Sequence, residues 1–393
     1  MSNRTVVIVA AKRTPLGSFH GQFASLSASD LGAEAIKSAI ESSAINADSI
    51  DSVHMGCVLP AGQGQAPARQ AALKGGAPLS TPCNTVNKMC GSGMQTVIYG
   101  FNEIMSGSAN CVIAGGMESM TNAPFILPKA RNGQKMGDGE MLDHMFCDGL
   151  KDVKHGKLMG SFAELCADKF SFTREAQDDF AIQSLERANN AIKSGAFDNE
   201  VCPVVVKSRK GEVEYTVDEQ PGNAVIDNIR SLRPAFKKDG TVTAANASSI
   251  SDGAAALVLM NADEAANKGL TALAKITAHA SYAADPDWFS TAPVYAIQKL
   301  MKTCGWGVGD VDLFEINEAF AVVTMAAIKE LNLSAEKVNV NGGTCALGHP
   351  IGASGARVIV TLLHALQARK LSKGIASLCI GGGEATALAI EIL

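Results

Sequence analysis

One stretch of the chain reads Asn341-Gly-Gly-Thr-Cys-Ala-Leu-Gly-His-Pro-Ile-Gly-Ala-Ser-Gly-Ala-Arg357, a glycine-dense turn that leads into an apolar helix. It carries one histidine, His349, directly before Pro350. The glycines permit backbone angles and close approaches that a side chain would block, and the proline ends any helix that enters from upstream. His349 is therefore expected where a loop meets a helix. It either packs in a tight turn or faces a ligand that approaches the exposed backbone amides.

The composition is that of a globular protein with large buried cores, since 47% of the 393 residues are hydrophobic. The chain has 34 Lys and Arg against 39 Asp and Glu, a net charge of -5, and no long basic run. No apolar stretch approaches the roughly 20 residues that span a bilayer. We therefore expect neither nucleic acid nor a membrane as a partner.

The ten cysteines form no C-x-x-C pair and no zinc-binding spacing, so we expect free thiols and no metal. A strand-like run at 6–10 stands where a signal or transit peptide would be found, and the final residues are not a peroxisomal tripeptide. These features predict a cytoplasmic protein.

Short apolar runs alternate with longer amphipathic runs, at 6–9 and 31–40, at 53–58 and 66–73, and at 94–105 and 112–114. The pattern restarts near residue 272, at 274–278, 292–303, 313–316, 319–331 and 378–380. This alternation predicts an α/β fold of two similar halves, each a mixed, mostly parallel sheet covered by helices.

Two pairs of glycine-rich segments match each other across the halves. Residues 90–98 lie over 352–360, with Ser92 and Ser354 separated by 354 − 92 = 262 positions. Residues 113–118 lie over 379–384 at a separation of 384 − 118 = 266 positions. Such turns can match by chance, but both pairs occur in the same order, and we interpret them as an internal duplication.

Residues 121–249 separate the two copies and are too long to be a simple connection. The segment follows an expected Gly115-Gly116 loop at a strand end, so we predict an inserted subdomain that covers the ligand site there. The apolar run 253–260 is expected to return to the first half as a strand. The predicted domains are 1–120 with 250–270, the insert 121–249, and 271–393.

Three more side chains are expected near His349. Cys90 precedes Gly-Ser-Gly at the start of the helix that the repeat pairs with the one after His349. A helix N-terminus favours a thiolate, so Cys90 is either a nucleophile or an inert buried cysteine. Cys379 ends an apolar strand before three glycines, and Asn317 ends another strand. Asn317 is either the N-cap of the next helix, the commoner role, or a polar group in the same cleft.

Together these residues suit acyl transfer. Over essentially its full length the chain resembles the thiolase family, acetyl-CoA acetyltransferase (acetoacetyl-CoA thiolase) type. Four motifs in order carry the resemblance: Asn87-Lys-Met-Cys90-Gly-Ser-Gly, Asn317-Glu-Ala-Phe, Asn341-Gly-Gly-x-x-Ala-Leu-Gly-His349-Pro-Ile-Gly-Ala-Ser-Gly and Cys379-Ile-Gly-Gly-Gly. The resemblance implies αβαβα layers, an inserted loop subdomain that binds coenzyme A, and acyl-CoA and CoA as substrates without a cofactor.

The resemblance also implies a role for each matching residue. Cys90 would take the acyl group, activated by His349. His349, with a water held by Asn317, would then bind the thioester oxygen of a second acetyl-CoA. Cys379 would be the acid or base at the carbon that is deprotonated, and the amides of Cys90 and Gly381 would receive the oxyanion.

Five residues match positions that line the pantetheine channel in the family: Met159, Phe236, Ala244, Ser248 and Phe320. Ser248 could equally be a cap in a turn. The stretch 131–143 resembles the loop that joins dimers in tetrameric thiolases, so a homotetramer is expected rather than a dimer.

The chain also departs from the family pattern. Leu158 stands where short-chain members usually carry histidine, and Pro221 where many carry an arginine near the adenine. Phe289 and Ser290 replace a usual Met-Gly pair beside the acyl pocket, so the acyl chain length is left open. Cys345 replaces a usual aliphatic residue and is either a packing residue or an oxidation-sensitive thiol.

Two other functions remain open. A ketoacyl synthase-like condensing enzyme would share the duplicated fold, but it should pair its cysteine with two histidines or with a histidine and an asparagine. A non-catalytic protein that binds acyl-CoA or lipid would share the fold alone. Cys379 argues against the first, and the presence of all four motif residues argues against the second.

Overall fold

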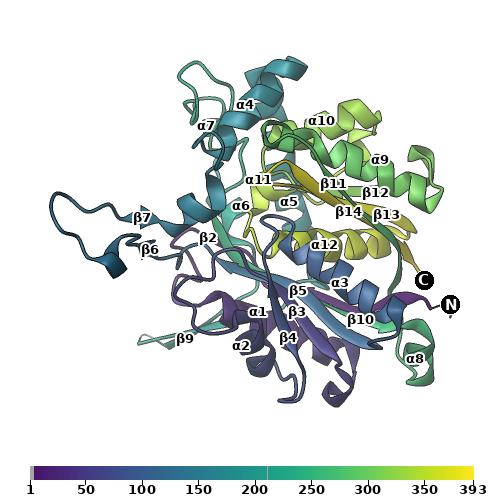
Figure 1. The fold of residues 1–393 in the computed structure, drawn as a ribbon. Helices are drawn as coiled ribbons and strands as arrows, with labels where there is room; N and C mark the ends of the chain where they lie inside the picture. Colours follow the sequence, from purple (N-terminus) through teal and green to yellow (C-terminus); the bar gives the residue numbers. More distant parts are fainter. Residues whose placement is uncertain (1–3, 210) are drawn as a thin grey trace.

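A computed structural model describes residues 4–209 and 211–393 (Figure 1). The first half of its main sheet contains β1 (Val6–Arg13), β10 (Ser251–Asn261), β5 (Cys111–Ser119), β3 (Ser52–Gly56) and β4 (Cys83–Val86), in that order. The second half contains β11 (Ala274–Ala283), β14 (Glu384–Ile392), β13 (Lys373–Ile380) and β12 (Leu313–Ile316). β1 pairs with β11 over two residues and joins the halves, and short β2 (Gly17–Ser18) pairs with β10.

The directions of the strands confirm a mixed sheet that is mostly parallel in each half. β3 runs parallel to β4 and to β5, while β10 runs antiparallel to β5 and to β1. Only β10 therefore opposes the other four large strands of this half. β14 plays the same part in the second half, where it is antiparallel to β11 and to β13. The two halves share one plan, as the internal repeat predicts.

Helices cover the sheet in the layered order αβαβα (Figure 1). α3 (Ser92–Ser106) and α12 (Ser354–Arg369) pack on each other and on strands of both halves. α1 (Ala28–Ser43) and α2 (Pro67–Lys74) cover the outer face of the first half, and α9 (Ala292–Cys304) and α10 (Ala321–Leu331) that of the second. Side chains alternate between these layers. Val6 and Ile8 of β1 join the central core, while Val7 and Val9 join the outer one.

Ser92 and Ser354 are the first residues of α3 and α12, which supports the predicted pairing of these helices. The two helix starts touch through glycine, because a Cβ on Gly355 would lie 2.3 Å from the amide nitrogen of Met94. Helices that begin so close together bring their free N-terminal amides to one place. The repeat therefore places both glycine-rich segments at one site.

The expectation of a Gly115-Gly116 loop is wrong. β5 continues through both glycines to Ser119, paired with β10 throughout. The glycines are needed because neighbouring backbone lies close: a Cβ on Gly116 would be 2.0 Å from the carbonyl oxygen of Gly352. The matching segment after β13 does turn, at Gly381–Gly383, so the second pair of matched segments diverges after its strand.

The segment between the copies contains a protruding arm and several small elements (Figure 1). They are β6 (Phe125–Ile126), β7 (Leu142–Asp143), the π-helical turn η3 (Met145–Leu150), α4 (Met159–Phe170), α5 (Arg174–Ser194), β8 (Val204–Ser208), β9 (Gly211–Tyr215), α6 (Glu219–Asn223) and α7 (Ile226–Ile229). Arg13 of β1 anchors this segment, since its fully buried guanidinium binds Glu200 at 2.6 Å and Asp218 at 2.7 Å.

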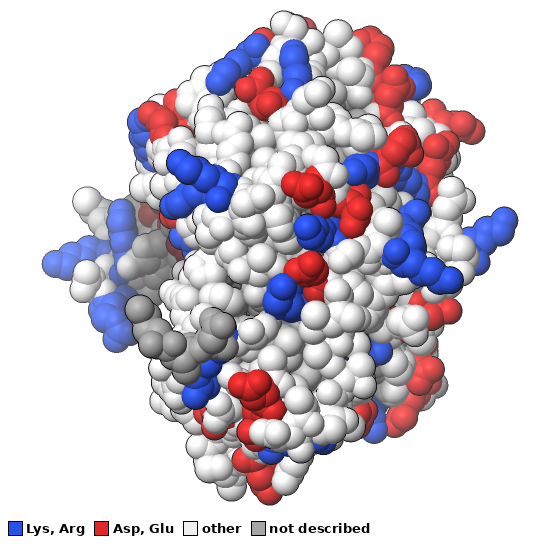
Figure 2. Space-filling view, turned by 90° about the vertical axis from the view of Figure 1, so that its right-hand side faces the viewer, with Lys and Arg blue, Asp and Glu red and all other residues white. Residues whose placement is uncertain are grey.

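Smaller elements complete the chain: α8 (Ala262–Asn267), α11 (Thr344–Leu347) and the 3-10 turns η1 (Ala47–Ser49), η2 (Ala130–Asn132), η4 (Pro286–Thr291), η5 (Val308–Asp310) and η6 (Ala335–Lys337). Within residues 4–209 and 211–393, no helix combines the length and the apolarity needed to cross a membrane. On the face drawn in Figure 2, acidic and basic side chains are interspersed, and neither sign forms one continuous patch over that face.

Candidate active site

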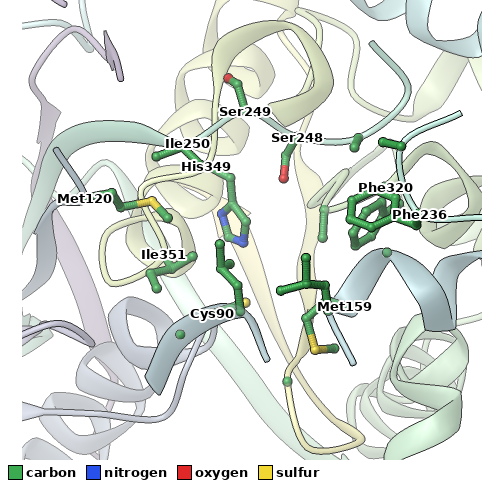
Figure 3. A pocket seen from close by; sticks show the side chains of 18 of the residues that line it. Cys90, Met120, Met159, Phe236, Ser248, Ser249, Ile250, Phe320, His349 and Ile351 are labelled. Atoms are coloured by element: carbon green, nitrogen blue, oxygen red, sulfur yellow. The ribbon is translucent and has the colours of Figure 1, made fainter. Parts of the chain in front are cut away.

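A cavity of about 410 Å³ lies where the two halves meet the inserted segment (Figure 3). Cys90, His349 and Gly381 are among its lining residues. All five residues predicted for the pantetheine channel line the same cavity: Met159, Phe236, Ala244, Ser248 and Phe320. Its wall is otherwise mainly apolar. The structure therefore brings three of the predicted chemical residues and all five channel residues, from distant parts of the chain, to one cavity, while Cys379 and Asn317 lie outside its lining.

Cys90 lies in a strained turn that immediately precedes α3. Met89 has φ +46°, a left-handed conformation that costs a non-glycine residue about 1 kcal/mol or more. Ser92 stabilises this turn, because its hydroxyl accepts from the amide of Lys88 at 2.8 Å and donates to the carbonyl of Met89 at 2.6 Å. Asn87 also accepts from the amide of Met89 at 3.0 Å. The sequence around the cysteine thus builds a fixed turn with the thiol at its end.

The pKa of Cys90 is shifted upward, opposite to the lowering that a helix N-terminus predicts. Burial raises it to about 11, and the charge of Glu118 adds to the rise. Hydrogen bonds from the amides of Gly381 and Cys90 lower the pKa, but they do not outweigh burial. The helix start thus supplies amides to the sulfur without making a resting thiolate. Cys90 rests as a neutral thiol that requires a base.

His349 is 5% exposed, and its ring points toward Cys90 (Figure 3). Nδ1 lies 2.6 Å from the hydroxyl of Ser354, which itself donates to the carbonyl of Pro350 at 3.0 Å. Because that hydroxyl proton is already engaged, Ser354 accepts, and Nδ1 carries the proton. Nε2 is then the unprotonated nitrogen of the ring.

Asn317 faces the unprotonated side of the same ring. Its Nδ2 lies 3.5 Å from Nε2 of His349, and its Oδ1 accepts from Thr344 at 3.2 Å. The favoured N-cap role is wrong. α10 starts only at Ala321, its N-cap is Phe320, and Asn317 is fully buried in the site. The turn between β12 and α10 instead directs this amide toward His349.

The pKa of His349 is lowered to about 3, first by burial and then by the nearby charge of Arg357. The imidazole is therefore neutral at physiological pH. A neutral ring whose Nε2 is unprotonated can accept a proton, and this ring points toward a thiol that must lose one (Figure 3). The orientation and the protonation state of His349 therefore both suit it to accept the proton of Cys90.

Cys379 is the last but one residue of β13 and is 1% exposed. Burial raises its pKa well above the usual value, and the neighbouring Cys90 raises it further. Gly381 follows in the turn, lines the cavity, and directs its amide at Cys90. Cys379 in β13 and Gly381 after it thus both act on Cys90, one as a neighbouring neutral thiol and the other as a hydrogen-bond donor.

Two residues of the site were not singled out as functional in the sequence. Ser354 was used only to align the repeat, although its equivalence to Ser92 could have indicated a shared structural task. Glu118 is fully buried and accepts from the amides of Val58 at 2.9 Å, Leu59 at 3.2 Å and Gly352 at 2.9 Å. Burial raises its pKa to about 7. No sequence pattern reveals that this carboxylate joins the two halves.

The positions that depart from the family pattern lie in different surroundings. Leu158 and Phe289 line the cavity, while Pro221 is buried in α6 outside its lining. Phe289 packs against Phe320 with ring centroids 6.2 Å apart. Cys345 contacts Glu318, and burial raises the pKa of its thiol well above the usual value. Within the described part of the chain, no group of three or more His, Cys, Asp and Glu side chains is arranged to hold a metal ion.

These features define an α/β acyltransferase with a duplicated fold, and sequence comparisons give its family. The family description "Thiolase, N-terminal domain" matches residues 6–263, and "Thiolase, C-terminal domain" matches residues 270–392. The chain belongs to the thiolase family.

Individual relatives are similar over their full length. An acetyl-CoA acetyltransferase of Escherichia coli (strain K12) is 51% identical over 393 residues, which cover 99% of this chain and 100% of that protein. One from Cupriavidus necator is 48% identical over 388 residues, covering 98% and 99%. The crystal structure of the Bacillus anthracis acetyl-CoA acetyltransferase superposes with a TM-score of 0.97 at 41% identity, covering 99% of both chains.

Proposed function

We propose that this thiolase is an acetyl-CoA C-acetyltransferase that converts two acetyl-CoA into acetoacetyl-CoA and CoA, reversibly, through an acyl thioester on Cys90. The observation that carries the proposal is a neutral His349, with Nε2 unprotonated, whose ring points toward the neutral Cys90 thiol at the apolar cavity that both residues line (Figure 3). The names of its relatives, at 48% and 51% identity, support the same reaction.

In the first half-reaction, Nε2 of His349 takes the proton of Cys90 as the sulfur attacks the thioester carbonyl. Both groups rest in the neutral state, so this transfer accompanies the attack instead of preceding it. The carbonyl oxygen becomes an oxyanion, for which the amides of Cys90 and Gly381 are the donors. Collapse of this intermediate breaks the bond between the carbonyl carbon and the CoA sulfur. CoA leaves with the proton of Cys379, which becomes a thiolate, while His349 keeps the proton of Cys90.

In the second half-reaction, the thiolate of Cys379 removes a proton from the methyl carbon of acetyl-CoA. His349, and a water held by Asn317, bind the thioester oxygen on which the enolate charge develops. The enolate carbon attacks the acyl carbonyl on Cys90, and the sulfur of Cys90 leaves and takes its proton back from His349. A thiol whose resting pKa is high is suited to return this proton, which the reverse reaction requires.

The apolar channel supports a coenzyme A thioester as the substrate. Met159, Phe236, Ala244 and Phe320 would contact the pantetheine arm, with Ser248 as a polar anchor. No cofactor is required for this chemistry. In this proposal, catalysis takes place between the two halves, which are residues 1–120 with 250–270 and residues 271–393. The insert, residues 121–249, binds coenzyme A.

We propose a homotetramer in the cytoplasm, with a role in fatty acid metabolism. The arm formed by β6 and β7 supports this assembly, because it protrudes from the body and exposes large apolar side chains (Figure 1). Met136 is 95% exposed, and Phe125, Leu127 and Met141 are about 60% exposed. Such side chains are typical of a surface that a second copy covers.

A thiolysis assay tests the function. Purified protein is mixed with acetoacetyl-CoA and CoA, and loss of the 3-ketoacyl absorbance is followed, with substrates of C4 to C16 to define chain length. Turnover, with an acyl group on Cys90 detected by mass spectrometry, is the expected result. Binding of acyl-CoA without turnover at any chain length would favour the non-catalytic alternative, and decarboxylative condensation of a malonyl thioester would favour a ketoacyl synthase-like enzyme.

A further inference from the structure

An ion pair joins the turn that carries Cys90 to the turn that carries Gly381. Lys88, two residues before Cys90, contacts Glu384, three residues after Gly381. The two side chains are only 23% and 37% exposed. They belong to opposite halves of the molecule, since Lys88 precedes α3 and Glu384 begins β14.

The backbone between these charges makes further contacts across the same junction. The position of a Cβ on Gly91 would be 2.4 Å from Cδ1 of Ile380, and that on Gly381 would be 3.9 Å from Cε of Met89. Residues 88–91 thus lie directly against residues 380–384. The Met89 conformation at this junction is strained, so surrounding contacts must maintain it.

The junction matters because the two oxyanion donors come from different halves. The amides of Cys90 and Gly381 must converge on one oxygen, and both already act on the Cys90 sulfur. Donors of this kind are effective only within a few tenths of an ångström of the correct position. A slight shift of one turn relative to the other would therefore slow acylation without changing how the substrate binds in its channel.

We infer that Lys88 and Glu384 are a pair of positioning residues that fix the Gly381 amide relative to Cys90. This inference rests on the proposed function, because the two amides that the pair aligns are the proposed oxyanion donors in formation of the acyl-enzyme. Neither residue lines the cavity, so their effect acts through the two turns and not through contact with the substrate.

The test measures two quantities in Glu384→Gln, Lys88→Gln and the double variant. The first is the rate of acylation of Cys90 by acetoacetyl-CoA, measured together with KM. The second is the rate of Cys90 alkylation by iodoacetamide at pH 9, which needs no thiolase activity. The double variant is the decisive one for alkylation, because it leaves the net charge near Cys90 unchanged. Glu391→Gln is the matched control: it breaks the similarly exposed pair of Lys275 and Glu391 at the far end of β14.

We expect each single variant to lower the acylation rate about fivefold with KM unchanged, and the double variant to be no slower than either single one. The charge-swapped Lys88→Glu/Glu384→Lys, which keeps the summed length of the two side chains, should recover most of the rate. Alkylation should slow about threefold in the double variant, because the Gly381 amide no longer favours the thiolate.

Several results would overturn the inference: unchanged acylation, losses that multiply in the double variant, a swap that recovers nothing, or a rise in KM at unchanged acylation rate. Failure of the proposed function has a different signature. If the unmodified protein forms no acyl-enzyme, the alkylation rates of the double variant and of Glu391→Gln still decide whether the ion pair positions Gly381.

Discussion

The two helix starts at the centre of the molecule occupy equivalent places in the two halves but hold their proposed catalytic side chains differently. At α3, the hydroxyl of Ser92 bonds twice to backbone and fixes a strained turn around Cys90. At α12, the hydroxyl of Ser354 bonds once to backbone and once to the ring of His349 itself. One serine therefore fixes where a side chain starts, and the other fixes where a side chain points.

The difference follows from the two kinds of side chain. A cysteine has one rotatable bond before its sulfur, so the position of its backbone nearly determines that of the thiol. A histidine must also choose a ring orientation and a tautomer, and a hydrogen bond at Nδ1 sets both. Equivalent serines in the two halves thus support the proposed nucleophile in one half and the proposed base in the other. The comparison suggests substitutions that separate the two tasks.

The largest effect is expected from Cys90→Ala, which removes the nucleophile at the first helix start. We expect thiolysis to fall by at least about 10⁴-fold and acyl-enzyme formation to be lost. Incubation with radiolabelled acetyl-CoA and autoradiography of the denatured protein measure the adduct. Cys304→Ala, at the end of α9, is the control and should label normally. Label that persists on Cys90→Ala would refute the role of Cys90.

Cys379→Ser should separate the two half-reactions. Because the serine hydroxyl is a far weaker acid than the thiol, we expect proton exchange at C2 of acetyl-CoA to fall about 10²- to 10³-fold. Acylation of Cys90 should persist. Deuterium exchange into acetyl-CoA, followed by NMR, measures the first quantity, and intact-protein mass the second. Unaltered exchange would count against Cys379 as the acid or base.

Ser354→Ala tests the second helix start. Without an acceptor for Nδ1, the imidazole loses its fixed tautomer and orientation, and we expect kcat to fall about tenfold to a hundredfold with KM nearly unchanged. Steady-state thiolysis at fixed pH measures both constants. Ser354→Thr, which retains the hydroxyl, should recover most of kcat. Equal losses in the Thr and Ala variants would mean that packing at this buried position, and not the hydrogen bond to His349, is what matters.

The sequence predicted much of this arrangement for identifiable reasons. Glycine spacing and the alternation of apolar runs are local, so the duplication, the helix starts at Ser92 and Ser354 and the strand ends could be anticipated. The sequence could not show that Gly115 and Gly116 continue a strand, because the backbone that excludes a Cβ at each comes from distant residues, Ala255 and Gly352. Burial likewise depends on residues that are distant in sequence. It raises the pKa of Cys90, whereas the helix start alone predicts a lowered pKa.

The Asn317 error has a similar cause. An asparagine that follows a strand and precedes a helix is commonly an N-cap. The local pattern does not indicate that three more residues separate Asn317 from the start of α10. Its true partners, His349 and Thr344, are 32 and 27 residues away in sequence. The five channel residues were predicted because they match positions that line the channel in the family, and all five line the cavity.

Ser92→Ala tests the first helix start and should have a smaller effect than Ser354→Ala. Its loss leaves the amide of Lys88 without its acceptor, which should cost on the order of 1 kcal/mol in the free energy of unfolding. Because Asn87 and the contacts with the Gly381 turn still hold Met89, we expect kcat to fall only about threefold. Urea unfolding and steady-state thiolysis measure the two effects. A loss of kcat as large as that of Ser354→Ala would contradict the conclusion that Ser92 fixes only the turn while Ser354 orients the His349 ring.

The smallest change is expected from acidification, because the base at the second helix start is already neutral. The pKa of His349 is lowered to about 3, so its base form persists as pH falls from 8 to 5. A histidine with a pKa near 6.5 would instead lose about 30-fold of its base form at pH 5. We expect kcat/KM for acylation to change less than about threefold over this range, with the protein's fold monitored by circular dichroism. Any bend near pH 7 is assigned to Glu118, whose pKa is about 7, and should vanish in Glu118→Gln. A tenfold fall per pH unit below 6.5 that survives in Glu118→Gln would show that His349 is more accessible to water than its 5% exposure allows.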